Sequence, residues 1–192
     1  MNSMTDWTNF QLVEVLWKAI STEYSTRNSP LRTPTVATVG AKHPHIRTMV
    51  LREIHPYHLI FFTDRRSQKC IDITVNPNTS VHCYLPSGQQ QIQMYGTMSM
   101  SIPLTSPSSI GKRLMKNALR RPQDYATFEP PGLEVSTLDS IHYDHSLAEH
   151  NFVPLVFDVS EIHLLTLGSP HQRCKWQRNL ETNLWSKQWL VP

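Results

Sequence analysis

The sequence contains few cysteines, few glycines and no long apolar run. Its 192 residues include 3 Cys and 6 Gly. Cys70, Cys83 and Cys174 lie far apart without a CxxC pair, which argues against a disulfide framework or a thiolate zinc site and favours buried free thiols. No apolar run approaches the roughly 18 residues that a membrane span needs, and the first residues lack a signal-peptide pattern. We therefore expect a soluble, cytoplasmic protein without a membrane partner.

Charge and chemical motifs are also sparse. The 18 Lys and Arg residues against 15 Asp and Glu give a net charge of +3, too mild and dispersed to predict a nucleic-acid partner. The motifs GxGxxG and GxSxG are absent, which sets aside Rossmann cofactor binding and nucleophilic hydrolysis. His142, His145 and His150 are irregularly spaced and favour a polar surface loop, so we expect no metal site.

Short β-rich runs dominate what is present. They are separated by polar or Pro-containing breaks, and closely spaced strands with few helices favour a small antiparallel barrel. The predicted strands cover residues 35–40, 45–53, 57–63, 80–85, 90–102, 153–167, 172–179 and 184–190. Gly96, inside one of these runs, indicates a bulge or a close backbone approach.

Three helices are predicted beside the strands. An amphipathic helix covers about residues 8–24, with Thr8 and Gln11 as a capping box or Thr5 as an alternative start. A short helix is capped by Asp64 and stops before Asn76 and Pro77. The third helix, residues 110–119, lies in an irregular insertion of about residues 103–151.

The most informative stretch for chemistry runs from Arg47 to Lys69. It combines strand residues with cations and hydroxyls around a strand-to-helix junction, the setting that a phosphate requires. On composition alone, a solvated basic edge strand explains the same residues, because Lys and Arg commonly protect exposed strand edges.

The order of six segments goes beyond composition. RTMVLR (47–52), FFTDRRSQK (61–69), NPNTSV (76–81), QQIQMYG (90–96), HQR (171–173) and the closing WLVP resemble, in this order, the pyridoxamine 5′-phosphate oxidase family of FMN-binding split barrels. The overall pattern is similar to a shorter, poorly characterised branch of that family. The resemblance implies a mainly β fold over residues 1–192 as one domain: a six-stranded antiparallel split β-barrel (Greek key) with flanking α-helices.

The resemblance also implies the FMN contacts. Arg47 and Lys69 would hold the phosphate with Ser67, the strand backbone would line the ring, and Gln91 and Arg173 would lie near the ring. Gln68 stands where the family has an arginine, with Arg66 as a possible substitute. The residues implied to bind the cofactor are Arg47, Thr48, Met49, Val50, Leu51, Arg52, Phe62, Thr63, Ser67, Gln68, Lys69, Gln91 and Arg173.

The substrate side matches the family less well. Arg52 and His171 are implied to contact substrate, but Ser169 replaces an arginine, and Arg120, Arg121 and Tyr125 are only candidates for holding an anionic group. We expect a homodimer, because family members build each flavin site from both subunits. No catalytic residue is predicted.

Three function classes stay open. The first is an FMN-dependent oxidoreductase acting on an unidentified small substrate, with a pyridoxamine-phosphate-type amine as the best-known version. The second is a non-catalytic protein that stores or senses FMN. The third is a split barrel that binds haem, for which His163, at the position of a flavin-contacting tryptophan in the family, is the single hint.

Overall fold

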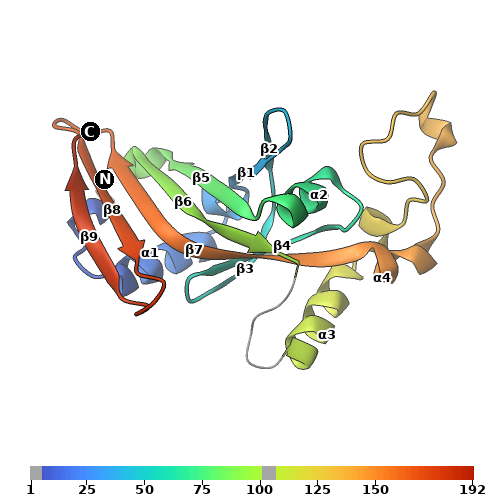
Figure 1. The fold of residues 1–192 in the computed structure, drawn as a ribbon, viewed down its shortest axis with the longest axis horizontal. Helices are drawn as coiled ribbons and strands as arrows, with labels where there is room; N and C mark the ends of the chain where they lie inside the picture. The colour runs from blue at the N-terminus through green and yellow to red at the C-terminus, as the bar shows by residue number, and fades with distance from the viewer. Residues whose placement is uncertain (1–5, 101–106) are drawn as a thin grey trace.

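A strongly twisted antiparallel sheet forms the body of the protein (Figure 1). The structure, a computed structural model, describes residues 6–100 and 107–192. Seven strands follow the order β2-β1-β5-β6-β7-β4-β3, and β8 and β9 extend the sheet from β7, so the described residues form nine strands where the resemblance implies a six-stranded barrel. The strands are β1 Thr35–Val39, β2 Pro44–Thr48, β3 Leu51–His55, β4 His58–Asp64, β5 Asn78–Leu85, β6 Gln90–Ser99, β7 Phe152–Thr166, β8 Gln172–Arg178 and β9 Trp185–Leu190.

Helices pack around this sheet, and the mainly β prediction with flanking helices is confirmed. The α-helices are α1 Val13–Ser25, α2 Gln68–Val75, α3 Pro107–Ala118 and α4 Ala148–Asn151. Short 3-10 helices cover Trp7–Asn9, Pro30–Arg32, Pro86–Gly88, Pro122–Tyr125, Leu138–Ser140 and His145–Leu147. Within residues 6–100 and 107–192, none of the helices has the length and apolar character needed to cross a bilayer.

The first helix begins later than predicted. Thr8 lies in the preceding 3-10 helix, where its backbone N–H and hydroxyl bond the Asp6 carboxylate, so the Thr8–Gln11 capping box is wrong. Leu12 is the N-cap of α1 and provides no side-chain hydrogen bond. The alternative start at Thr5 lies outside the described residues, as does the predicted end of the 90–102 strand.

The predicted strand 45–53 is two strands, and this break organises the barrel. β2 pairs with β1 and β3 pairs with β4, so the two strands occupy opposite ends of the seven-strand path. The two-residue link Met49–Val50 joins these ends, and Met49 is buried and donates its N–H to the carbonyl of Pro34 at 3.0 Å. A seven-strand path whose ends are consecutive in sequence must curl on itself, which brings β2 and β3 close together.

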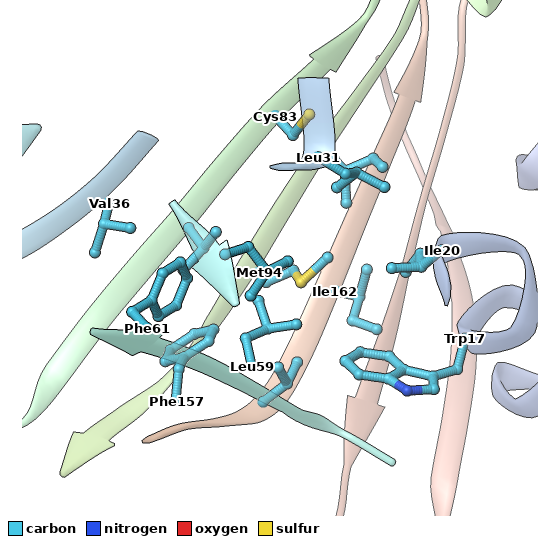
Figure 2. Close-up of a cluster of buried hydrophobic side chains, with 14 of the residues drawn as sticks. Trp17, Ile20, Leu31, Val36, Leu59, Phe61, Cys83, Met94, Phe157 and Ile162 are labelled. Carbon is cyan, nitrogen blue, oxygen red and sulfur yellow. The ribbon is translucent and has the colours of Figure 1, made fainter. Parts of the chain in front are cut away.

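The core lies on the inner face of this curled sheet. Figure 2 shows Phe61 of β4, Met94 of β6 and Ile162 of β7 pointing toward one another, with Ile20 of α1 alongside. β6 alternates as a half-buried strand should, with Ile92 and Met94 inward and their neighbours outward. The three cysteines are buried and free, as predicted, and burial raises the pKa of Cys83 and of Cys174 to about 12.

A second, smaller core covers the outer face of β4. The insertion contributes Ala118, Tyr125 and Ala148, which pack with Phe152, and Phe62 of β4 packs against this group. The Phe62 and Phe152 rings meet edge to face, with centroids 5.0 Å apart. The insertion, in which the helix predicted at 110–119 is confirmed as α3, is therefore anchored to the sheet beside Phe62.

Gly96 is confirmed as both a bulge and a close approach. The register between β6 and β7 shifts between Tyr95 and Gly96. A Cβ atom at Gly96 would lie 1.9 Å from the Asp158 carbonyl oxygen, a separation that only backbone movement could relieve.

We therefore expect Gly96→Ala to lower the free energy of unfolding by about 2 kcal/mol or more, as over-packing against backbone does. Gly168→Ala is the matched control, because its nearest atoms would be 3.8 Å away. Urea denaturation of both variants measures the difference. Equal stabilities of the two variants would contradict the tight approach at Gly96.

Candidate functional site

The junction between β4 and α2 is the part of the molecule where the sequence predicts a phosphate site. α2 begins at Gln68 with Ser67 as its N-cap, not Asp64. Asp64 ends β4 and forms a turn in which the Ser67 N–H donates to its carbonyl at 3.1 Å, which displaces the helix start by three residues. The Ser67 side chain makes no capping bond to the helix, so the first-turn amides have no acceptor from the cap side chain, and the Cys70 N–H donates to the Ser67 carbonyl at 2.9 Å. The predicted helix end before Asn76 is confirmed.

Lys69 reaches back over this junction. Its Nζ donates to Thr63 Oγ1 at 3.1 Å, and Thr63 Oγ1 lies 3.3 Å from the buried Ser67 Oγ. No carboxylate lies within ion-pairing distance of Lys69 in the part of the chain that the structure describes. Burial lowers the pKa of the Lys69 amine, and the positive charge of Arg47 acts in the same direction. Lys69 and Arg47 are therefore neighbouring, partly desolvated cations.

Arg47 enters from β2, the strand next to β1. Its guanidinium donates to Thr38 Oγ1 at 2.8 Å and lies 3.7 Å from Asp72 Oδ2 of α2. Burial lowers the pKa of Arg47, while the charge of Asp72 opposes that shift. Arg47 is thus held in place between two elements, unlike a solvated cation on an exposed edge strand.

The Asp72 carboxylate is the best-satisfied acceptor of this region. Its side chain is 3% exposed, and it accepts hydrogen bonds from Thr38 at 2.6 Å, Gln68 at 3.0 Å and His45 at 2.8 Å. Burial raises the pKa of Asp72, but the hydrogen bonds from Gln68, Thr38 and His45 outweigh it and hold the pKa below its usual value. Asp72 is therefore ionised at neutral pH.

Sequence reasoning missed Thr38, His45 and Asp72. The Gln68–Asp72 spacing of four residues on a predicted helix was the one available signal, because such pairs meet on a helix surface. Thr38 and His45 come from other strands and could be found only with the fold. Arg66, predicted as a substitute cation, instead pairs with Asp64 at 2.7 Å and donates to the carbonyls of the insertion.

The segment 47–52 divides at the β2–β3 link. Thr48 and Val50 are exposed, whereas Met49 and Leu51 are buried. Arg52 lies past the link on β3, where its guanidinium stands over the Phe62 ring, 5.4 Å from the centroid. The cations at the two ends of this segment therefore face different parts of the protein: Arg47 faces α2, and Arg52 faces the insertion.

Beside Arg52 is a cavity of about 310 Å³ between the sheet and the insertion. Burial raises the pKa of its Tyr125 hydroxyl. Its main lining residues are Arg52, Phe62, Arg120, Arg121 and Tyr125. Glu53 and Asp124 also line it, and Arg121 lies 3.4 Å from Asp124, so the three arginines exceed the carboxylates by one positive charge, which favours an anionic ligand.

Gln91 and Arg173 are not brought to the phosphate region within one protomer. Both pair with Leu165 of β7, whereas Thr63 pairs with Val153 of the same strand. Twelve residues of β7, roughly 40 Å of extended strand, separate these positions along the sheet. Figure 1 shows β7 crossing most of the length of the molecule. Gln91 and Arg173 also share the outer face of the sheet, because their neighbours Ile92 and Cys174 are in the core.

The two residues predicted to contact substrate are also far apart. Arg52 on β3 connects through β4 to Leu155 near the start of β7, while His171 directly precedes β8, which begins opposite Thr166. His171 is exposed. One protomer therefore does not unite Arg52 and His171 in a single pocket.

Fold and junction together define a class: a barrel-like antiparallel sheet with a cationic, hydroxyl-rich site at a strand-to-helix turn, as FMN-binding split barrels have. Residues 11–101 match the model of the family described as pyridoxamine 5′-phosphate oxidase, FMN-binding domain. The predicted resemblance is thus confirmed over residues 11–101, the segment that matches this FMN-binding domain. FMN is confirmed as the cofactor at the level of this domain.

Two curated proteins that are similar to this chain are named as oxidases of the same kind. The chain is 33% identical over 79 residues to a pyridoxine/pyridoxamine 5′-phosphate oxidase of Mannheimia succiniciproducens, covering 41% of this chain and 37% of that protein. It is 28% identical over 98 residues to the enzyme of the same name from Chromohalobacter salexigens, covering 50% and 45%. The chain thus matches less than half the length of these two curated relatives.

Solved structures show the same fold. A pyridoxamine 5′-phosphate oxidase-related, FMN-binding protein of Nostoc punctiforme matches with a TM-score of 0.71 at 23% identity, over 96% of this chain and 100% of that chain. PhzG of Burkholderia lata, solved with tetrahydrophenazine-1-carboxylic acid, matches with a TM-score of 0.74 at 17% identity, over 100% and 99%.

The Asp72 network predicts a pH-dependent contribution to stability. Because its folded-state pKa lies below the ordinary value of 3.8, the ionised carboxylate stabilises the fold above that value, and this stabilisation is lost as the pH falls through the folded-state pKa. We expect Asp72→Asn to cost about 1–3 kcal/mol at neutral pH, with a smaller difference from wild type below about pH 4. Urea denaturation across this pH range measures the difference in the free energy of unfolding. Asp139→Asn, which removes an exposed carboxylate, is the control. A difference that does not change with pH would contradict this account.

Proposed function

We propose that the protein is an FMN-dependent oxidoreductase in which Arg47 and Lys69 hold the cofactor phosphate. The observation that carries this proposal is the pairing of two neighbouring, partly desolvated cations beside the Thr63 and Ser67 hydroxyls. A phosphomonoester carries a charge of about −2 at neutral pH. Such an anion would offset the repulsion between the two cations, and the N-terminus of α2 would add backbone N–H donors.

The proposed cofactor site is shared between two copies of the chain. Gln91 and Arg173, proposed to donate to the flavin ring, lie on the outer sheet face and roughly 40 Å of strand from Thr63. One FMN cannot touch both groups in one protomer. A homodimer that places the outer face of one protomer against the α2 junction of its partner would complete the site, and a symmetric dimer would form two such sites.

Within this site each group has a physical role. When bound, FMN supplies the hydride acceptor for oxidation of the substrate. Arg47, Lys69 and Thr63 orient the cofactor by its phosphate, while Gln91 and Arg173 place donors beside the ring, where they favour a reduced, negatively charged ring. Thr48 and Val50, which are both exposed, offer further contacts among those predicted from the family.

The proposed substrate is a small molecule with an anionic group. The cavity of about 310 Å³ beside Arg52 is the candidate recess, because its three arginines outnumber its two carboxylates, Glu53 and Asp124. Pyridoxamine phosphate is the first compound to assay, since the curated relatives are named for such oxidases. We propose a cytoplasmic location, where FMN is available.

Storage or sensing of FMN without turnover is the second candidate function. The separation of Arg52 from His171, and Ser169 in place of an arginine, both favour it. The haem alternative has less support: His163 is hydrogen-bonded to Glu161 on its own strand and packs edge to face with Tyr95.

For the phosphate site, we expect Arg47→Ala combined with Lys69→Ala to weaken FMN binding about 100-fold or more, because two charge-assisted contacts are lost. Riboflavin, which lacks the phosphate, should bind both proteins alike. Quenching of flavin fluorescence gives both affinities. Lys18→Ala with Arg27→Ala removes two exposed cations as a matched control. Unchanged FMN affinity in the first variant would refute the assignment.

For turnover, we expect anaerobic mixing of the FMN-loaded protein with a suitable donor to bleach the visible absorption band of the flavin, which air then restores. Pyridoxamine phosphate, pyridoxine phosphate and reduced nicotinamides are the first donors to test. Protein that stays yellow with every donor supports storage, and a Soret band after reconstitution with haem supports the third class.

A further inference from the structure

The phosphate site of this chain contains an anion of its own. Asp72 Oδ2 lies 3.7 Å from the Arg47 guanidinium, and the Asp72 side chain is 3% exposed. Carboxylates near a phosphate site repel the ligand and attract the same cations. Arg47 thus already has a carboxylate partner before any phosphate arrives.

The network around Asp72 fixes the carboxylate beside Arg47. Thr38 of β1 donates to Oδ2 at 2.6 Å, and His45 of β2 contacts the same oxygen at 2.8 Å. Gln68 holds the other oxygen, Oδ1, at 3.0 Å. The Asp72 carboxylate is therefore contacted from three elements, β1, β2 and α2, and cannot turn away from Arg47 without breaking these bonds.

Gln68 has a particular part in this arrangement. It precedes Lys69 at the start of α2, and its amide is turned toward Asp72. A cation at this position would neutralise the same carboxylate, whereas the neutral amide orients Asp72 and leaves Arg47 as the arginine that pairs with it. Among Arg47, Lys69 and Asp72, the formal charge sums to +1, less than a phosphate dianion requires for neutralisation.

We propose that Asp72 is an internal counter-anion that competes with the cofactor phosphate for Arg47, so that this chain binds FMN more weakly and exchanges it more readily than the same pocket with a neutral residue. Asp72 thereby sets the cofactor affinity without touching the flavin. This inference rests on the proposed placement of the FMN phosphate at Arg47 and Lys69.

Binding of FMN would change the partners of Arg47. Without FMN, Arg47 is stabilised by Asp72 and Thr38. With FMN, the guanidinium must be shared between the phosphate and the carboxylate, and the two anions repel one another across it. The cost is specific to the phosphate, so riboflavin should not be affected by Asp72.

The test compares apo-protein variants by flavin fluorescence quenching. Asp72→Asn keeps the shape of the side chain and removes its charge, and we expect FMN to bind about tenfold more tightly while riboflavin binding stays the same. Asp139→Asn, which removes one exposed carboxylate elsewhere, should leave both affinities unchanged. Inorganic phosphate should also displace FMN from Asp72→Asn, and it should do so at lower concentrations than an uncharged competitor.

A double-mutant cycle tests whether Asp72 affects FMN binding through Arg47. In the Arg47→Ala background, Asp72→Asn should improve FMN affinity by less than about twofold, because the shared cation is gone. If Asp72→Asn does not fold, Asp72→Ser removes the same negative charge and should tighten FMN binding in its place.

Equal or weaker FMN binding by Asp72→Asn would overturn the inference and leave Asp72 as a residue that only positions Arg47. A different result would contradict the proposed function: Arg47→Ala combined with Lys69→Ala would leave the FMN affinity unchanged. Phosphate-dependent binding in wild type, with no gain in Asp72→Asn, would refute the counter-anion alone.

Discussion

Desolvation of two like charges at one strand-to-helix turn is the constraint on which the functional account depends. Lys69 gives up water to bond Thr63, and Arg47 lies close enough for its charge to lower the pKa of the Lys69 amine. Nearby cations without enough counter-charge are costly, so such an arrangement favours a bound anion. Asp72 supplies one negative charge to Arg47, and we propose that the FMN phosphate supplies the rest.

The barrel brings these groups together through its link between β2 and β3. Because Met49–Val50 joins strands at opposite ends of the sheet path, β2 can lay Arg47 against α2 while β3 carries Arg52 to the insertion. Residues only five positions apart thus face different parts of the protein: Arg47 the proposed phosphate site, and Arg52 a separate cavity. The long strand β7 separates both from Gln91, which is why a second copy of the chain is proposed to complete the ring site.

Local patterns in the sequence predicted much of this structure. Strand alternation and helical spacing located most elements, and Gly96 marked its bulge because no larger residue fits there. Strand 45–53 could not be divided in advance, since the break at Met49–Val50 comes from pairing with two different partners. Asp72 was missed for the same reason: three of its contacts come from β1 and β2, and only tertiary structure assembles them. The site residues themselves stay predictions.

A crystal structure of the protein grown with FMN tests the central claim most directly. The account predicts phosphate density within hydrogen-bonding distance of the Arg47 guanidinium, Lys69 Nζ and Thr63 Oγ1, with the ring against Gln91 of a second copy. Phosphate density at any other part of the surface, with the Lys69–Thr63 bond undisturbed and its surroundings empty, would contradict it.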